Sequence, residues 1–254
     1  MELAGKIALV TGGSRGIGRD ICEALSVAGA RVVCAATRAE NAGDTVAAIR
    51  QKGGQAMAVG GRVENREEVG ALFDRVEAEW EAVDILVNNA GIAEPKPILD
   101  MTEADYDRVM DVNAKSVFLC SQRAAKTMKD RKRGGAIVHI GSINGINAFP
   151  DRLSYGAAKA AVHQMTRVMA VEWAEYGIRV NCVAPGYIRT DLVADLADRG
   201  ILDEQRLVAR IPQRRLGKGS EVADAVVFLA GEKAAYFTGS VLVMDGGWVA
   251  YGYL

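Results

Sequence analysis

The chain has few of the residues that build metal centres and disulfide frameworks. Its 254 residues include two histidines, His139 and His163, and four cysteines with no C-x-x-C pair. Zinc sites and disulfide scaffolds need closely spaced Cys and His residues, so we expect no metal, buried reduced thiols and two packing histidines. Residues 141–145 also lack the G-x-S-x-G pattern of a serine hydrolase. Hydrolysis and metal-dependent chemistry are therefore poor candidates.

Long hydrophobic runs, linkers and an excess of one charge are also missing. No apolar stretch approaches the ~20 residues of a membrane span, and residues 1–3 lead into the first expected strand without a signal peptide. The formal net charge of −1 gives no general attraction to nucleic acid or anionic membrane. With 50% hydrophobic residues and no repeat or Pro/Ser-rich linker, residues 1–254 are expected to form one cytoplasmic domain.

Strand and helix patterns alternate along the whole chain. Short apolar runs predict strands, and apolar residues at helical spacing predict the helices between them. Such alternation indicates parallel strands with right-handed crossovers, so we predict an α/β fold with one seven-stranded, doubly wound parallel sheet. The expected strands cover residues 6–11, 31–36, 56–60, 84–88, 136–140, 179–184 and 240–244, and the expected helices follow a first helix ending at residue 25 and cover residues 40–52, 65–80, 102–131, 154–176 and 220–231.

A glycine-rich turn follows the first expected strand. Gly12, Gly16 and Gly18 lie between that strand and the first helix. A dinucleotide pyrophosphate can approach a backbone only where no Cβ intervenes, and N–H groups at a helix start bind its charge. The spacing G-x-x-x-G-x-G differs from the commonest dinucleotide fingerprint, so a plain loop and a cofactor site both stay open at this point.

A tyrosine and a lysine stand one helical turn apart in the expected helix 154–176. Tyr155 and Lys159 project from the same face of an alanine-rich stretch. An ammonium group near a phenol favours the phenolate, and this makes the phenol a proton donor. A chain with seven tyrosines can contain such a pair by chance, so its weight depends on the other motifs.

These features resemble, in order and spacing across the whole chain, the short-chain dehydrogenase/reductase family. The other motifs are Asn-Asn-Ala-Gly at residues 88–91, Asn113, Ser142, and Pro185-Gly186 with Thr190. The resemblance implies a single-domain Rossmann fold, a nicotinamide cofactor and hydride transfer to or from a carbonyl or alcohol carbon. Within the family the chain is most similar to 3-oxoacyl thioester reductases, through residues 5–11, 36–37 and 238–247.

The resemblance assigns catalytic roles to four residues. Ser142 would donate a hydrogen bond to the substrate carbonyl. Tyr155 would protonate the developing alkoxide, or accept the proton in oxidation. Lys159 would favour the phenolate and hold the nicotinamide ribose, and Asn113 would anchor a water chain to Lys159.

The expected cofactor contacts follow from the same resemblance. An NAD enzyme of this fold has an acid after the second strand that would repel a 2′-phosphate. Here Thr37 and Arg38 stand there, and Arg15 lies in the glycine turn, so we predict a preference for NADPH, with NADH use still open. Arg62 departs from the family's usual Asp, which receives the adenine amino group. The expected contacts are Gly12, Ser14, Arg15, Gly16, Ile17, Gly18, Thr37, Arg38, Val63, Asn88, Ala90, Gly91, Tyr155, Lys159, Pro185, Gly186, Ile188 and Thr190.

The expected substrate site is mostly apolar. Residues 187–215 resemble the family's substrate lid and contribute Leu192, Val193, Leu196, Ile201 and Leu202. The substrate contacts would be Ser142, Asn144, Phe149, Tyr155 and Tyr187. This lining favours reduction of a 3-oxoacyl thioester or hydrophobic ketone. Oxidation of a polyol or sugar alcohol is the alternative, and a non-catalytic NADPH sensor is a remote one.

Two surface features concern partners. The basic run at residues 129–133 suits an acidic acyl carrier protein, but Val171 stands where those reductases often carry Arg, which weakens this interpretation. The expected helices 102–131 and 154–176 carry apolar residues on more than one face. The resemblance implies a symmetric homotetramer that pairs these helices. The aromatic tail, expected near another two-fold axis, comprises Trp248, Tyr251, Tyr253 and Leu254.

Overall fold

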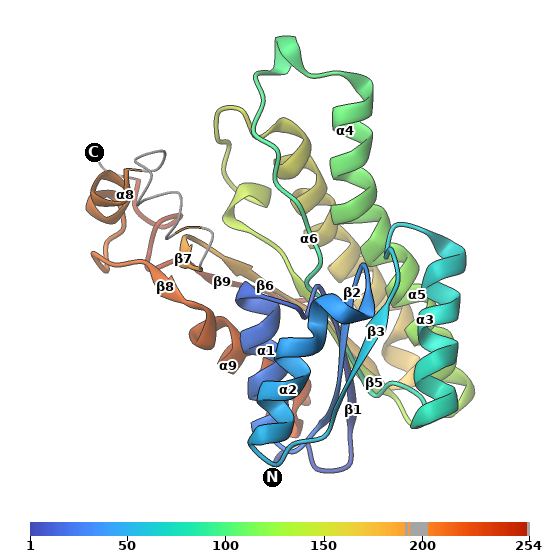
Figure 1. Cartoon of the computed structure of the whole chain (residues 1–254). Coiled ribbons are helices and arrows are strands. Elements are labelled where there is room, and N and C mark those ends of the chain that lie inside the picture. Colours follow the sequence, from blue (N-terminus) through green and yellow to red (C-terminus); the bar gives the residue numbers. More distant parts are fainter. Residues whose placement is uncertain (191–192, 194–202, 253–254) are drawn as a thin grey trace.

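Seven parallel strands form one sheet, as predicted. The computed structural model describes residues 1–190, 193 and 203–252. The strand order is β3-β2-β1-β4-β5-β6-β9, and helices cover both faces of this sheet (Figure 1). The expected lid residues Leu192, Leu196, Ile201 and Leu202 and the tail residues Tyr253 and Leu254 lie outside the described residues. No helix in the described part of the chain is long and apolar enough to cross a membrane.

The strand boundaries agree with the predicted ones to within one residue. The sheet contains β1 (Ile7–Thr11), β2 (Arg31–Ala36), β3 (Ala56–Gly60), β4 (Ile85–Asn88), β5 (Gly135–Ile140), β6 (Ile178–Pro185) and β9 (Val241–Met244). A separate small sheet pairs β7 (Ile188–Arg189) with β8 (Gly217–Lys218). The helices are α1 (Gly16–Val27), α2 (Gly43–Gln51), α3 (Arg66–Glu79), α4 (Glu103–Met110), α5 (Ser116–Asp130), α6 (Leu153–Trp173), α8 (Glu204–Arg210) and α9 (Gly219–Ala230).

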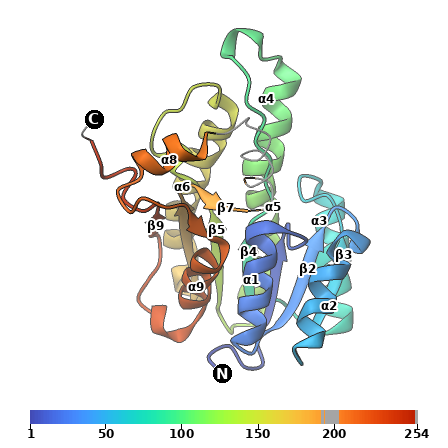
Figure 2. The ribbon, with the colours of Figure 1, turned by 60° about the vertical axis from the view of Figure 1, so that its left-hand side comes forward.

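Successive residues of β1 supply the two halves of the core. Ala8 and Val10 pack in a cluster that includes residues of α1, α2 and α9. Ile7 and Leu9 pack on the opposite face, in a cluster with residues of α3, α5 and α6. This alternation follows from the two-residue period of a strand, and burial on both faces explains the continuous apolar run. Figure 2 shows the two helical layers.

The sheet has a topological switch point at its centre. β1 pairs with β2 on one side and with β4 on the other, so the chain leaves β1 and β3 in opposite directions across the sheet. In sheets of this type ligands bind beyond the carboxyl ends of the strands at that point. In both views α4 and α8 lie at one end of the molecule, beyond the sheet and away from the N-terminus (Figures 1 and 2).

One long predicted helix is interrupted. The expected helix 102–131 forms α4 and α5, joined by a π-helical turn at Asp111–Lys115. The side chain of Asn113 explains this turn, because its Nδ2 donates to the carbonyl of Val109 at 2.9 Å and to that of Ile92, in another segment, at 2.8 Å. An inserted side-chain bond of this kind competes with the regular helical ladder.

The glycine turn is packed too tightly for a side chain at Gly18. A Cβ built there would lie 2.1 Å from the carbonyl oxygen of Gly12 and 2.5 Å from Nδ2 of Asn89. Gly12 itself has a φ of +66°, which L-residues rarely adopt. The turn therefore lies directly against the end of β4.

We expect Gly18→Ala to lower the free energy of unfolding by about 1–3 kcal/mol, the usual effect of overpacking. The matched control is Gly70→Ala in α3, where an added Cβ meets nothing within 4 Å. That variant should gain about 0.5–1 kcal/mol because alanine favours helix. Urea unfolding of both variants measures the difference, and equal stabilities would contradict the packing described for Gly18.

Candidate active site

The end of β4 is bonded to the end of β1. The hydroxyl of Thr11 accepts hydrogen bonds from the backbone N–H groups of Asn89 and Ala90, both at 3.0 Å. The amide of Asn89 donates to the carbonyls of Thr11 at 3.0 Å and Gly12 at 3.1 Å. Asn89 therefore holds the glycine turn in place. Asn88, Ala90 and Gly91 are predicted cofactor contacts, but Asn89 is not among them. Its position in the Asn-Asn-Ala-Gly motif is the sequence signal that points to it.

Asn88 points into the core rather than into the site. Its Nδ2 donates to Oγ of Ser121 and to Nδ1 of His139, both at 3.0 Å. These bonds use both amide hydrogens, so the amide nitrogen of Asn88 is not available for the cofactor contact predicted there.

The same bonds fix the state of His139. With the Asn88 amide as donor, Nδ1 accepts, and the proton of the neutral ring is assigned to Nε2, which has no partner among the described residues. Burial, with a smaller effect of the nearby Lys159 charge, lowers the pKa of His139 to about 3. The ring is therefore neutral, as a packing residue should be.

Lys159 connects α6 to the end of β5. Its side chain is buried, and Nζ donates to the carbonyl of Ile140 at 2.7 Å. Nζ lies 5.6 Å from the ring centroid of Tyr155, one helical turn earlier. A Cβ built on Gly91 would lie 3.8 Å from this Nζ and 2.6 Å from Oδ1 of Asn113. The structure thus brings Tyr155, Lys159, Asn113 and the Asn-Asn-Ala-Gly motif to one edge of the sheet.

Ser142, two residues after Ile140, is buried beside Asn144. Its Oγ accepts hydrogen bonds from the backbone N–H of Asn144 at 3.1 Å and from the Asn144 amide at 3.4 Å. A hydroxyl has two lone pairs and one hydrogen. With both lone pairs engaged, the hydrogen is left to donate to a substrate carbonyl. Asn144, predicted as a substrate contact, therefore orients the hydroxyl of Ser142.

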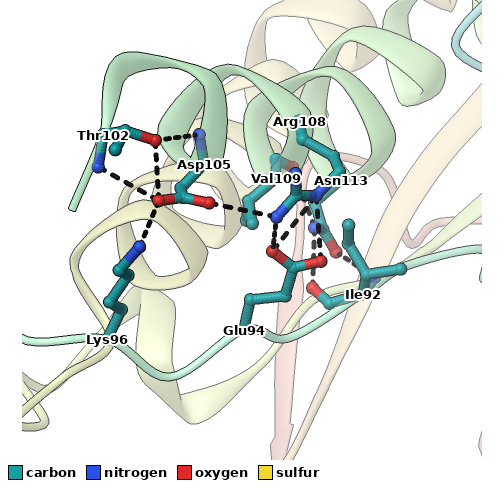
Figure 3. Close-up of polar contacts among 8 residues, drawn as sticks. All are labelled: Ile92, Glu94, Lys96, Thr102, Asp105, Arg108, Val109 and Asn113. Carbon is teal, nitrogen blue, oxygen red and sulfur yellow. Dashed lines mark hydrogen bonds and ion pairs between the residues drawn. The ribbon is translucent and has the colours of Figure 1, made fainter.

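The amide of Asn113 anchors the segment that follows β4. Besides the two bonds from Nδ2, its Oδ1 accepts from the N–H of Ile92 at 3.3 Å (Figure 3). The side chain is fully engaged with protein atoms. The predicted water chain would therefore depend on the backbone of Asn113, where the π-helical turn disturbs the regular carbonyl pairing.

Ion pairs fasten the same segment to α4 (Figure 3). Arg108 bonds the carboxylate of Glu94 through two of its nitrogens. Lys96 bonds Asp105 at 2.6 Å, and Asp105 also forms the capping box with Thr102 at the start of α4. Asn113 and these pairs together attach residues 92–96 to α4 and the π-helical turn that follows it.

The start of α1 fits the pyrophosphate of a dinucleotide. Arg15 caps the helix without a side-chain hydrogen bond, and the first turn contains no acidic residue. Gly16 has a φ of +53°, and a Cβ there would meet only Thr190, at 3.7 Å. The first N–H groups of α1 are thus available to an anion, beside a residue that the sequence also assigned to the cofactor.

The two arginines expected at the 2′-phosphate are exposed. Arg15 and Arg38 form no ion pair or side-chain hydrogen bond with any residue in the described ranges. Arg62 is different, because its guanidinium bonds Glu68 at 2.6 and 2.8 Å, and its N–H bonds the same carboxylate at 2.7 Å. Arg62 therefore joins the loop that precedes α3 to Glu68 in the first turn of that helix.

The remaining expected cofactor residues lie at the same carboxyl edge. Val63 follows β3 and is buried, and Pro185 ends β6. Gly186 allows close packing on Asp245, since a Cβ would lie 2.8 Å from its Cα. Ile188 is buried in β7, the short strand that the sequence did not predict.

Three aromatic rings gather at the expected substrate site. Trp248 stacks on Phe149 with centroids 6.2 Å apart and contacts Tyr187 at 5.0 Å. Arg210 holds the tail in place, with its guanidinium 4.8 Å from the Trp248 ring and a 2.7 Å bond to the Tyr251 carbonyl. The family resemblance places Trp248 near a subunit interface. Within this chain Trp248 contacts Phe149 and Tyr187, two predicted substrate residues.

Comparison with known proteins agrees with this geometry. A family model described as enoyl-(acyl carrier protein) reductase matches residues 12–249. The chain belongs to the short-chain dehydrogenase/reductase family. It is 39% identical to 3-oxoacyl-(acyl-carrier-protein) reductase FabG of Escherichia coli, over 97% of this chain and 98% of the relative. It is 42% identical, with the same coverage, to cis-4-hydroxycyclohexanecarboxylate dehydrogenase of Sinomonas cyclohexanicum.

A solved member of the family has nearly the same fold. The gluconate 5-dehydrogenase of Burkholderia cenocepacia, in complex with NADP and tartrate, is 36% identical and superposes with a TM-score of 0.93 over 98% of this chain and 97% of that one. The protein is thus an NAD(P)-dependent oxidoreductase with a Rossmann fold. The roles of the individual site residues stay predictions.

Acid should destabilise the protein through His139. The folded state lowers its pKa from 6.5 to about 3, so the unfolded chain binds the proton more readily. The stabilising contribution is complete above pH ~6.5 and is lost as the pH falls toward ~3, with a slope of about 1.4 kcal/mol per pH unit. Urea unfolding between pH 7 and pH 4 should show a shallower slope for His139→Gln than for the wild type. An equal slope would mean that His139 protonates without unfolding.

Proposed function

We propose that the protein uses NADPH to reduce a ketone to a secondary alcohol, with a 3-oxoacyl thioester as the first substrate class to test. The observation that carries this proposal is the position of three groups at one sheet edge. Lys159 lies near the ring of Tyr155 and is bonded to the end of β5, just before Ser142. A hydroxyl donor, a phenol and an ammonium group are what carbonyl reduction requires from the protein.

Each side chain has one task in this reaction. Ser142, with its lone pairs engaged by Asn144, donates its hydrogen to the carbonyl oxygen and polarises the bond. A nicotinamide cofactor, when bound, supplies the hydride. Tyr155 gives its proton to the developing alkoxide, and the Lys159 charge stabilises the phenolate that remains. Solvent returns the proton, so ketone, NADPH and one proton become alcohol and NADP+.

The preference for NADPH is supported by the charges near the expected adenosine. Arg15 and Arg38 are exposed, and neither has a side-chain partner among the described residues. A 2′-phosphate would pair with both guanidinium groups. The Burkholderia gluconate 5-dehydrogenase, which has almost the same fold, was solved with NADP.

Oxidation of a hydroxy acid is the second candidate, beside the polyol or sugar-alcohol alternative predicted from the sequence. The Sinomonas and Burkholderia relatives are named for substrates that carry a carboxylate. The aromatic cluster of Phe149, Tyr187 and Trp248 would pack on an apolar ring or chain. Both candidates use hydride transfer at the same carbinol or carbonyl carbon, and they differ in direction and in the rest of the substrate.

We also propose that a second copy covers the outer face of α5 and α6, in a homotetramer. This face has a groove of about 780 Å³, lined by residues that include Phe118, Met165 and Val168. Val168 and Phe118 are 45% and 39% exposed, and such apolar area favours association. Val171 is also exposed on α6, which leaves an acyl carrier protein without the arginine often found there.

Loss of NADPH absorbance with acetoacetyl coenzyme A tests the proposed activity. Tyr155→Phe should lower kcat by about 100- to 10,000-fold, because the general acid is lost. Its dissociation constant for NADPH should stay within about twofold. Full activity in this variant would contradict the role of Tyr155. Binding of NADPH without turnover of any ketone in a broad panel would favour the sensor alternative.

Arg38→Gln tests the cofactor preference. We expect it to raise the NADPH dissociation constant about 10- to 100-fold, the value of a charge-assisted hydrogen bond, with little change for NADH. Arg75→Gln is a control, since Arg75 is exposed and pairs with Glu79 on α3. Equal affinities of the wild type for NADPH and NADH would contradict the proposal.

A further inference from the structure

Arg152 is a partly buried cation at the edge of the expected substrate site, and it has no partner among the described residues. It is the N-cap residue of α6, one turn before Tyr155, and its side chain does not cap the helix. The side chain forms no hydrogen bond or ion pair with any residue of 1–190, 193 or 203–252. Partial burial of an unpaired charge costs free energy, so this position suits a bound anion.

Four other arginines near this end of the molecule have partners. Arg108 bonds Glu94, Arg189 bonds Glu204, and Arg215 bonds Glu221. Arg210 lies on two aromatic rings and bonds backbone carbonyls of the tail. Arg152 differs from all four because its side chain has no such partner among the described residues.

The surroundings of Arg152 place it toward the substrate. Its charge acts on the Tyr187 phenol, where it opposes the rise in pKa that burial causes. Tyr187 contacts Trp248, which stacks on Phe149, three residues before Arg152. The loop between Phe149 and Arg152 is fixed, because the carbonyl of Asp151 accepts from the N–H of Lys96 at 3.0 Å. Arg152 is thus three residues from Phe149 of the aromatic cluster and three from Tyr155, and it is near enough to Tyr187 for its charge to act on that phenol.

We propose that Arg152 binds the carboxylate of the substrate, so that the preferred substrate is an apolar oxo acid or hydroxy acid rather than a neutral ketone or a thioester. A guanidinium group matches a carboxylate with two parallel hydrogen bonds. The aromatic faces of Phe149, Tyr187 and Trp248 accept the apolar body between that carboxylate and the reacting carbon. The proposal rests on the hydride transfer at Tyr155 proposed above, and between the two substrate classes named there it favours the acid over the thioester.

A thioester would leave Arg152 unsatisfied. The thioester group is neutral, so the site would exchange the hydration of a cation for contact with apolar atoms. A carboxylate offsets that cost by pairing with Arg152. The pairing also makes the site selective for acids over neutral analogues, because a site built for a charged group rejects the analogue that lacks it.

The kinetic test compares two cyclohexanones that differ in one group. With NADPH, the wild type should have a higher kcat/KM for 4-oxocyclohexanecarboxylate than for 4-methylcyclohexanone or acetoacetyl coenzyme A. In Arg152→Gln the ratio of acid to neutral ketone should fall about 10- to 100-fold. Arg152→Lys should retain part of the preference, and Arg75→Gln on α3 should keep all of it. An unchanged ratio in Arg152→Gln, or a wild-type preference for the thioester, would overturn the proposal.

A binding measurement separates this proposal from the proposed activity. Cyclohexanecarboxylate has no reacting carbonyl, and cyclohexylmethanol is its neutral counterpart. Calorimetry with the NADP+ complex should show that the acid binds the wild type at least tenfold more tightly than the alcohol, and that Arg152→Gln removes this difference. Equal binding of the two by the wild type would overturn the carboxylate site even if ketones are reduced. The expected pattern would support it even if neither cyclohexanone is turned over.

Discussion

The pairing of β4 with β1 is the contact on which the rest of the site depends. It places the carboxyl ends of the two strands side by side at the switch point of the sheet, and the Thr11 hydroxyl and the Asn89 amide join them. Because Gly12 and Gly18 have no Cβ, the glycine turn can lie directly on that junction. The first N–H groups of α1 then face the space where a dinucleotide binds in folds of this type.

The predicted catalytic groups are placed by a second set of short connections. Lys159 joins α6 to the carbonyl of Ile140, and Ser142 follows on the same strand end. Asn113 joins the π-helical turn to Ile92, next to Gly91 and the Lys159 ammonium group. Lys159 and Asn113 are therefore each fixed by a bond to the backbone of another element, which is the preorganisation that proton and hydride transfer need.

The sheet could be predicted from the sequence because its strands are buried on both faces. Residues such as Leu9 and Leu86 must be apolar whichever face they meet, and the turns between strands and helices are rich in glycine. The motif residues could be recognised for a different reason. Gly12, Ser142, Tyr155 and Lys159 follow the order and spacing of the family's motifs along the chain.

The rest could not be predicted because it depends on contacts between distant segments. The π-helical turn arises from a bond between Asn113 and Ile92, 21 residues apart. Trp248 reaches Phe149 and Tyr187 only after the chain has passed β9, and no local pattern indicates this. In the sequence, Arg152 is an ordinary polar residue before a helix. The structure adds that its side chain has no partner among the described residues.

Transfer of deuterium from the cofactor tests the central claim most directly. NADPH deuterated at both C4 positions would be incubated with the ketone that gives the highest kcat/KM, and the alcohol analysed by mass spectrometry. The account predicts one deuterium at the carbinol carbon with the wild type, and loss of the product with Tyr155→Phe. An alcohol without cofactor deuterium, or equal product from the variant, would contradict hydride transfer at this site.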